Sequence, residues 1–308
     1  MKKISTLAWL FTIVVITGIL WNINVVSPAL VSSYLTVKTG VLSARINGST
    51  KNSPDKTIRL YQTRGNSYFA NSDYGRAITD YSKVIEFDPR STDAYFMRGE
   101  AYLKNLDFKK AAIDAEALLK FQMAIDRKID AANLLTNACV KLKEQDRAIK
   151  AFNELLKIST ENAKIYRYRG SSYGKFGDLD KAIADYSKAI ELDPKNADFF
   201  YGRGVFYYRK NDYNKAIEDF NRSIELYPEK VSAFYNRGTT YYRMGNDDAA
   251  YSDFLRVMEL RPVKSVFRMR ILYKIAAIGI SDLTGYRMDK GHRHRRNGRT
   301  VNEQIYLP

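Results

Sequence analysis

The sequence predicts an all-α protein in which a solenoid of antiparallel helix pairs follows an N-terminal transmembrane helix. Three observations support this prediction. The middle of the 308-residue chain repeats with a period of 34 residues. Within each repeat, apolar residues recur at spacings of three and four in two separate runs, which is the period of an α-helix. Residues 4–26 carry no charge, and a helix of that length spans roughly 34 Å, enough to cross a bilayer.

The N-terminal segment, residues 1–30, has two possible roles. Trp9 and Trp21 lie near the ends of the apolar run, where aromatic residues of a membrane-spanning helix meet the interface. A cleaved signal peptide is the alternative, because two lysines precede the run and small residues follow it at 27–29. The run is longer than the roughly 7 to 15 apolar residues of a signal peptide. We therefore expect an uncleaved anchor.

The short basic start of the chain favours an N terminus on the inside of a cell or inner membrane, with the repeats on the extracytoplasmic face. Cleavage of the segment would instead give a secreted or periplasmic protein. Residues 31–57 are rich in Gly, Ser, Thr, Asn and Lys. This composition predicts a flexible stalk.

Six repeats are expected over residues 58–264. Each has small residues at fixed positions, with glycine at position 8 in five repeats and alanine at position 20 in all six. Because glycine inside a helix costs about 1 kcal/mol, its recurrence indicates that a second helix packs closely there. Turn residues between the two runs and proline at position 32 delimit the helices. The repeat boundaries are 58–91, 92–125, 129–162, 163–196, 197–230 and 231–264.

These glycines, alanines and prolines, with aromatic residues at positions 4, 11 and 24, resemble the tetratricopeptide repeat (TPR) family. The resemblance implies a right-handed superhelix whose concave groove, lined by the first helix of each repeat, binds an extended or helical segment of another protein. The second and third repeats depart from the family pattern, with Met123 and Thr160 in place of proline and Thr136 in place of glycine. We expect looser packing or a changed superhelix angle at their junction.

A second pattern comes from the sequence alone. Five repeats have arginine at position 7 and aspartate at position 23, and the third repeat has lost both, with Leu135 and Ala151 there. Joint gain and loss predict a contact across the hairpin, a partly buried ion pair. These arginines are therefore not assigned to ligand binding. The predicted pairs are Arg64 with Asp80, Arg98 with Asp114, Arg169 with Asp185, Arg203 with Asp219 and Arg237 with Asp253.

The sequence contains no recognisable catalytic, cofactor or metal site. Both histidines, His292 and His294, lie near the C terminus among arginines, and the single cysteine, Cys139, replaces a core aromatic residue. The carboxylates occupy repeated positions, which argues against a unique acid–base pair. We therefore predict no enzymatic activity and no cofactor. The net charge is +16, but residues 1–57 and 265–308 contribute +11 of it, so nucleic acid is an improbable partner of the repeats.

The first helix of each repeat supplies the candidate binding residues. Positions 2, 5, 9 and 12 share one stripe of that helix, and in the fourth to sixth repeats the stripe contains four tyrosines that the repeat core was not expected to use. Broad rings suit an apolar or proline-rich segment, and two cations could meet a carboxylate. Alternatively, these side chains are ordinary surface residues. The predicted groove residues are Lys164, Arg167, Ser171, Tyr201, Tyr208, Tyr235 and Tyr242.

The C-terminal region is predicted to contain a capping helix at 265–281 and a basic tail at 282–308. Together these features predict a membrane-anchored, non-enzymatic scaffold that binds a protein or peptide segment in the groove. The alternative is a membrane-tethered binder of an anionic polymer, RNA or a cell-surface glycan, that uses the basic ends of the chain. The sequence identifies neither the partner nor the oligomeric state.

Overall fold

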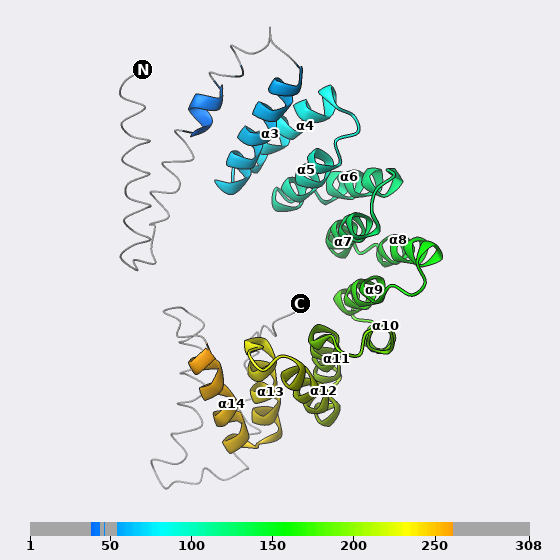
Figure 1. The fold of residues 1–308 in the computed structure, drawn as a ribbon, viewed down its shortest axis with the longest axis vertical. Helices are drawn as coiled ribbons and strands as arrows, with labels where there is room; N and C mark the ends of the chain where they lie inside the picture. Colours follow the sequence, from blue (N-terminus) through cyan, green and yellow to red (C-terminus); the bar gives the residue numbers. More distant parts are fainter. Residues whose placement is uncertain (1–37, 44–45, 47–53, 261–308) are drawn as a thin grey trace. The chain divides into compact units, whose positions relative to one another are not determined.

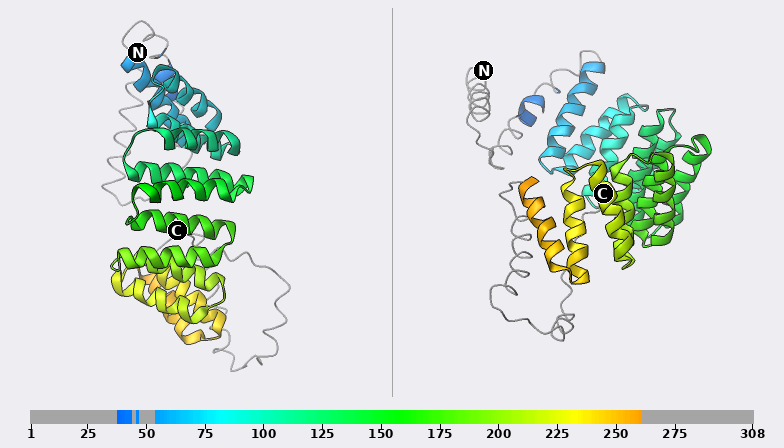
Figure 2. Two further views of the ribbon diagram at one scale, coloured as in Figure 1. Left: turned by 90° about the vertical axis from the view of Figure 1, so that its right-hand side faces the viewer. Right: turned by 60° about the horizontal axis from the view of Figure 1, so that its bottom comes forward.

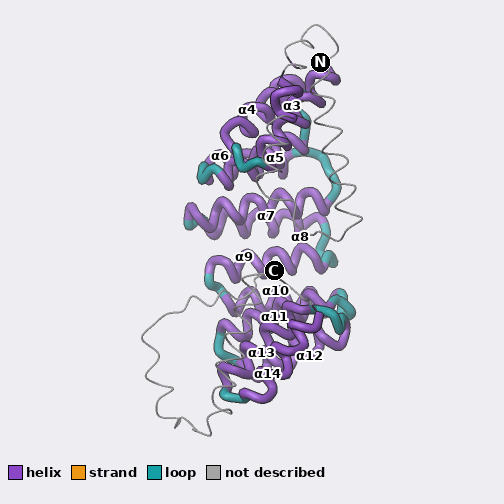
Figure 3. Tube along the Cα trace, turned by 90° about the vertical axis from the view of Figure 1, so that its left-hand side faces the viewer, coloured by secondary structure: helices purple, strands orange, loops and turns teal. Residues whose placement is uncertain are grey.

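The computed structural model describes residues 38–43, 46 and 54–260. In this part of the chain every regular element is a helix (Figure 3). The predicted membrane span at 4–26, the capping helix at 265–281 and the tail at 282–308 lie outside the described residues. None of the helices that the structure does describe is long and apolar enough to cross a membrane.

The chain divides into two compact units, one ending at Phe121 and the other beginning at Gln122. The boundary falls at the junction of the second and third repeats, where proline is replaced. The first unit contains α3 (Pro54–Ala70), α4 (Tyr74–Phe87), α5 (Thr92–Lys104) and α6 (Phe108–Lys120). The second contains α7 (Ile125–Leu142), α8 (Gln145–Ile158), α9 (Ala163–Phe176), α10 (Leu179–Leu192), α11 (Ala197–Arg209), α12 (Tyr213–Leu226), α13 (Val231–Met244) and α14 (Asp247–Leu260).

Consecutive helices form antiparallel hairpins. Each odd-numbered helix packs against the even-numbered helix that follows it (Figure 1), and within the second unit successive helices lie side by side (Figure 2). Polar caps set where the second helix of a hairpin begins. The side chains of Asp73, Asp107, Asp178 and Asp212 each accept a hydrogen bond from the backbone N–H three residues further on, as expected of an N-cap.

The core of a hairpin is a ring packed against a glycine. Tyr186 at position 24 is wholly buried, and a Cβ on Gly170 would lie 2.9 Å from its ring. The same ring packs against the next hairpin, since a Cβ on Gly202 would lie 2.0 Å from it. A single methyl group at Gly202 would therefore collide with Tyr186. This close approach confirms that the glycines admit a neighbouring helix. Tyr81, Phe220 and Phe254 are buried at the equivalent position.

Five arginines join the helices of their hairpins through bidentate ion pairs, as predicted. In each pair the arginine Nε donates to one aspartate oxygen at 2.8–2.9 Å and Nη2 donates to the other at 2.6–2.8 Å. The aspartate side chains are at most 9% exposed and the arginines 16–21%. The hydrogen bond that each arginine donates to its aspartate raises the pKa of Arg64, Arg169 and Arg203. In the third repeat Leu135 and Ala151 are buried instead.

The same guanidinium groups also connect neighbouring hairpins. Nη1 of Arg98 donates to Ser82 Oγ at 3.1 Å, and Nη1 of Arg203 donates to Ser187 Oγ at 3.0 Å. Arg169 and Arg237 donate to Asn153 and Asn221 in the same way, at 2.8 and 2.6 Å. Each acceptor lies on the second helix of the preceding hairpin. We call the five arginine–aspartate pairs with these acceptors the arginine ladder.

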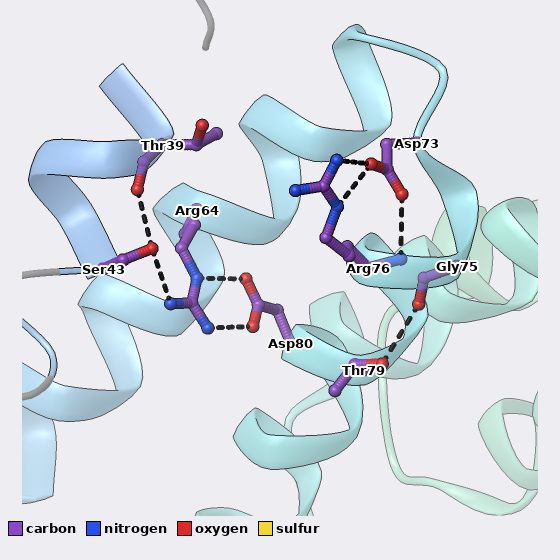
Figure 4. A network of polar contacts seen from close by, with 8 residues as sticks. All are labelled: Thr39, Ser43, Arg64, Asp73, Gly75, Arg76, Thr79 and Asp80. Atoms are coloured by element: carbon purple, nitrogen blue, oxygen red, sulfur yellow. Dashed lines mark hydrogen bonds and ion pairs between the residues drawn. The ribbon is translucent and has the colours of Figure 1, made fainter. Parts of the chain in front are cut away.

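The ladder begins before the first hairpin, in a segment for which a flexible stalk was predicted. Residues 38–43 are helical, and Leu42 and Ile46 are buried. Ser43 Oγ accepts a hydrogen bond from Nη1 of Arg64 at 3.0 Å and donates one to the Thr39 carbonyl (Figure 4). Here the structure differs from the stalk predicted over 31–57. The prediction rested on the average composition of the segment. It did not allow for two apolar side chains and one serine that hold a short helix in place by burial and by accepting a hydrogen bond from a ladder arginine.

The ladder gives a direct stability prediction. The Asp219→Ala variant leaves the half-buried Arg203 without its carboxylate, which should lower the free energy of unfolding by about 3–5 kcal/mol. The double variant Arg203→Leu/Asp219→Ala reproduces the apolar pair of the third repeat and should be more stable than Asp219→Ala alone. Urea unfolding followed by circular dichroism measures the free energy of unfolding of these two variants and of Arg203→Leu. If the loss in the double variant equals the sum of the losses in Asp219→Ala and Arg203→Leu, a direct pair is contradicted.

Candidate functional site

The first helices of the second unit form one continuous face. α7 contacts α9, α9 contacts α11 and α11 contacts α13, whereas the second helices of these hairpins make no comparable contact with one another within the described residues. The first helices are therefore closer together and lie on the inside of this unit's curve (Figure 1). We call the surface of α7, α9, α11 and α13 that points away from the second helices the inner face.

Polar contacts link adjacent first helices. Between α7 and α9, Lys164 Nζ lies 3.0 Å from Asp126 and Lys175 Nζ donates to Asn137 Oδ1 at 2.9 Å. Thr136 and Ser172 are hydrogen-bonded at 3.0 Å, so the threonine that replaces the repeat glycine makes a specific polar contact. The inner face is consequently a surface of charged and polar groups supported by a rigid layer of helices.

Two of the predicted groove tyrosines belong to the core. Tyr201 and Tyr235 are only 4% and 8% exposed, and their rings lie 6.0 Å from those of Phe220 and Phe254. Tyr201 Oη also accepts a hydrogen bond from Asn236 at 3.0 Å, and burial raises the pKa of its hydroxyl. The premise that the core does not use position 5 is therefore wrong for these two residues.

The other predicted residues remain accessible to different extents. Tyr242 is 36% exposed. Tyr208 is half-buried, with its ring 5.6 Å from that of Tyr213, and Ser171 is half-buried on α9. Lys164 is exposed and paired with Asp126. Their role in binding a partner stays a prediction.

Arg167 differs from the ladder arginines. Its guanidinium lies 4.6 Å from the centroid of the Tyr168 ring, and its buried Nε has no hydrogen-bond partner among the described residues. The hydroxyl of Tyr186 is also buried, with Ser171 as its hydrogen-bonding neighbour. Burial raises the pKa of this hydroxyl, and the nearby positive charge of Arg167 opposes the rise.

Sequence reasoning missed three further groups near Arg167: Tyr186, Lys175 and Arg209. Burial lowers the pKa of Lys175, with a contribution from the charge of Arg167, and burial also lowers that of Arg209. Arg209 Nη1 donates to the Gly174 carbonyl at 2.8 Å. A signal was present, because position 13 is basic in both α9 and α11. Basic residues in the last turn of a helix are commonplace, so this pattern alone did not indicate a site.

Histidine and cysteine, residue types that bind metals and act as nucleophiles, are sparse among the described side chains. No group of three or more His, Cys, Asp or Glu residues that could hold a metal ion occurs among them. Cys139 is buried in α7, where a thiol is shielded from reagents. The inner face instead supplies hydrogen-bond donors and positive charge.

Truncation of the tyrosines should separate core from surface. Tyr201→Ala removes a buried ring and should lower the free energy of unfolding by about 3–5 kcal/mol. Tyr242→Ala removes a partly exposed ring and should change it by no more than about 0.5 kcal/mol. Urea denaturation of both variants provides the comparison. Equal losses would show that the two rings occupy similar environments and would refute this distinction.

Family models match part of the chain. A TPR repeat model matches residues 65–105, 175–211 and 206–245, and a tetratricopeptide repeat model matches residues 231–264. No curated protein matches the chain.

Solved structures with similar folds include a tetratricopeptide repeat protein from Parabacteroides merdae, with 14% identity, a TM-score of 0.58 and coverage of 79% of this chain and 92% of that one. YrrB, described as a TPR protein with an unusual peptide-binding site, has 23% identity, coverage of 64% and 97%, and a TM-score of 0.41. MamA from Desulfovibrio magneticus has 20% identity, coverage of 56% and 96%, and a TM-score of 0.43. The chain thus contains tetratricopeptide repeats in an all-helical solenoid.

Proposed function

We propose that this protein is an interaction scaffold whose inner face binds a segment of a protein partner. Proteins built from TPR repeats are generally scaffolds for protein or peptide partners and typically lack enzymatic activity. The observation that carries the proposal is Arg167, a half-buried cation on α9 that has no hydrogen-bonding or ion-pairing partner among the described residues. The guanidinium lies over the Tyr168 ring but its charge is not balanced by a carboxylate, so it is available to a ligand, whereas the ladder arginines are not.

The proposal treats all six hairpins from α3 to α14 as TPR repeats. The arginine–aspartate pair recurs in five of them. In the hairpin of α7 and α8, an apolar core that includes Leu134, Leu135 and Phe152 takes its place. The scaffold can therefore continue through the departure from the family pattern.

The proposal also includes a location. Residues 4–26, charge-free in sequence, would anchor the protein in a membrane with the repeats on the extracytoplasmic face. Protease added to intact cells should then digest the repeats. A mature chain that begins near Leu30 would point to the cleaved signal peptide, and repeats protected until lysis would contradict the orientation.

Site-specific photo-crosslinking tests the scaffold. A photoreactive amino acid at Ser171 or Tyr242, on the inner face, should give adducts with a protein partner in cells. The same group at Ala184, exposed on α10, is the matched control and should give none. Adducts at Ala184 alone, or none at either inner-face position, would contradict binding at the inner face.

A deletion separates this function from its rival. The segment 287–299 carries six basic residues and one acidic residue, which favours the alternative of an anionic polymer bound by the tail. Deletion of 287–299 should leave the adducts at Ser171 and Tyr242 intact. Their loss, together with steep salt dependence, would support polymer binding instead.

A further inference from the structure

Three cations at the centre of the second unit lack a carboxylate partner among the described residues. They are Arg167 and Lys175 on α9 and Arg209 on α11, and we call them the basic cluster. Two other cations of the first helices and their loops are neutralised: Lys164 pairs with Asp126, and Lys230 pairs with Asp198. The basic cluster instead contacts neutral groups, because Lys175 donates to an asparagine and Arg209 to a backbone carbonyl.

Arg167 retains an unsatisfied buried donor. The Tyr186 hydroxyl beside it has Ser171 as its hydrogen-bonding neighbour, much as the hydroxyl of the equivalent Tyr81 in the first repeat donates to Asn66 Oδ1 at 2.8 Å. Arg167 Nε is buried without a hydrogen-bond partner among the described residues. Buried polar groups in folded proteins are normally satisfied, so the Arg167 guanidinium lacks an acceptor that a ligand could supply.

The charges make an anionic acceptor the best match. Burial lowers the pKa of Lys175 and Arg209, and the charge of Arg167 lowers that of Lys175 further. An anion nearby would favour the charged forms of Lys175 and Arg209. The dipole of α9 accounts for Lys175 in its last turn, but not for Arg167 in its second turn. Arg167 lies over the Tyr168 ring without a carboxylate to balance its charge.

The nearest acidic candidate within the chain is already engaged. Asp198 acts electrostatically on Tyr186, yet its carboxylate forms an ion pair with Lys230. The carboxylate of Asp185, on the same helix as Tyr186, is held by Arg169 of the ladder. Neither carboxylate could therefore satisfy the basic cluster without breaking another pair.

We propose that the basic cluster binds the carboxylate side chains of an acidic, extended segment of the partner protein. One carboxylate would pair with the guanidinium of Arg167, and a second would lie beside Lys175 and Arg209. Arg167 and Lys175 are two helical turns apart, roughly 12 Å along α9. Acidic residues four apart in an extended strand are separated by about 13 Å and point the same way. This inference rests on the proposed function and specifies the chemistry of its ligand.

A peptide titration tests the inference. Full-length protein in neutral detergent is titrated into the peptide (Glu-Ser)4, which carries an uncharged dye, at physiological salt, and binding is followed by fluorescence anisotropy. This peptide presents carboxylates two, four and six residues apart on one face. It should bind at least tenfold more tightly than (Gln-Ser)4. Equal affinities for the two peptides would overturn the proposal.

Variants locate the site. Arg167→Gln and Lys175→Gln should each weaken binding of (Glu-Ser)4 at least threefold. Lys150→Gln removes the same charge from the exposed face of α8 and should leave the affinity unchanged. An equal loss with Lys150→Gln would show that binding depends only on net charge. Full displacement of the peptide by millimolar inorganic phosphate would show a site for small anions and would also overturn the proposal.

Melting temperatures provide a readout that separates binding from structure. Arg167→Gln and Lys175→Gln should leave the melting temperature unchanged while they weaken binding of (Glu-Ser)4. Lower stability with unchanged binding would refute the role of these side chains. Failure of the scaffold is distinguishable from failure of this site. Photo-adducts at Ser171 that persist in the Arg167→Gln variant would leave the scaffold standing and the carboxylate site refuted.

Discussion

The bidentate pair between an arginine on the first helix and an aspartate on the second is the interaction on which the solenoid depends. A buried carboxylate is tolerated only when its oxygens are satisfied, and in Arg203 and Asp219 both oxygens receive a donor from one planar group. The planar geometry fixes the relative rotation of the two helices. The remaining nitrogen donates to Ser187 of the preceding hairpin, so the contact that closes one hairpin also sets its register with the one before it. Glycine directly follows each ladder arginine in sequence, which allows the helices to approach closely at that level.

The ladder divides the basic residues of the chain into two groups. Arginines at position 7 are committed to holding hairpins together, and they face carboxylates that are almost fully covered. Arg167 lies two residues before the ladder arginine Arg169, so its side chain points in a different direction from the same helix. The next two repeats fill this position with the core rings of Tyr201 and Tyr235, whereas the fourth repeat has a cation there. This separation explains how a single helix, α9, can both maintain the scaffold and present charge on the inner face.

The fold could be predicted from the sequence because its determinants recur. The 34-residue period indicates a repeated helical hairpin. Within a hairpin, glycine at position 8 indicates close helix packing, and the joint loss of arginine and aspartate at Leu135 and Ala151 indicates a contact between those two positions. The use of position 5 was harder to predict. Tyr201 and Tyr235 pack beside Phe220 and Phe254 within their own hairpins, and Tyr201 also accepts a hydrogen bond from Asn236 of the next repeat. The buried Nε donor of Arg167 was missed because its lack of a partner depends on contacts between helices that the spacing of residues does not report. Ser43 was missed because it completes the ladder from outside the repeat pattern.

The central claim is that the ladder arginines are structural and Arg167 is reserved for a ligand. Hydrogen exchange of arginine Nε–H groups, followed by NMR at mildly acidic pH with and without (Glu-Ser)4, measures this difference directly. The five ladder groups should exchange slowly in both states, since each donates to a covered carboxylate, and Arg167 should gain protection only when the peptide is present. Ladder groups that exchange as fast as the exposed Arg90, or an Arg167 group that the peptide leaves unchanged, would contradict the account.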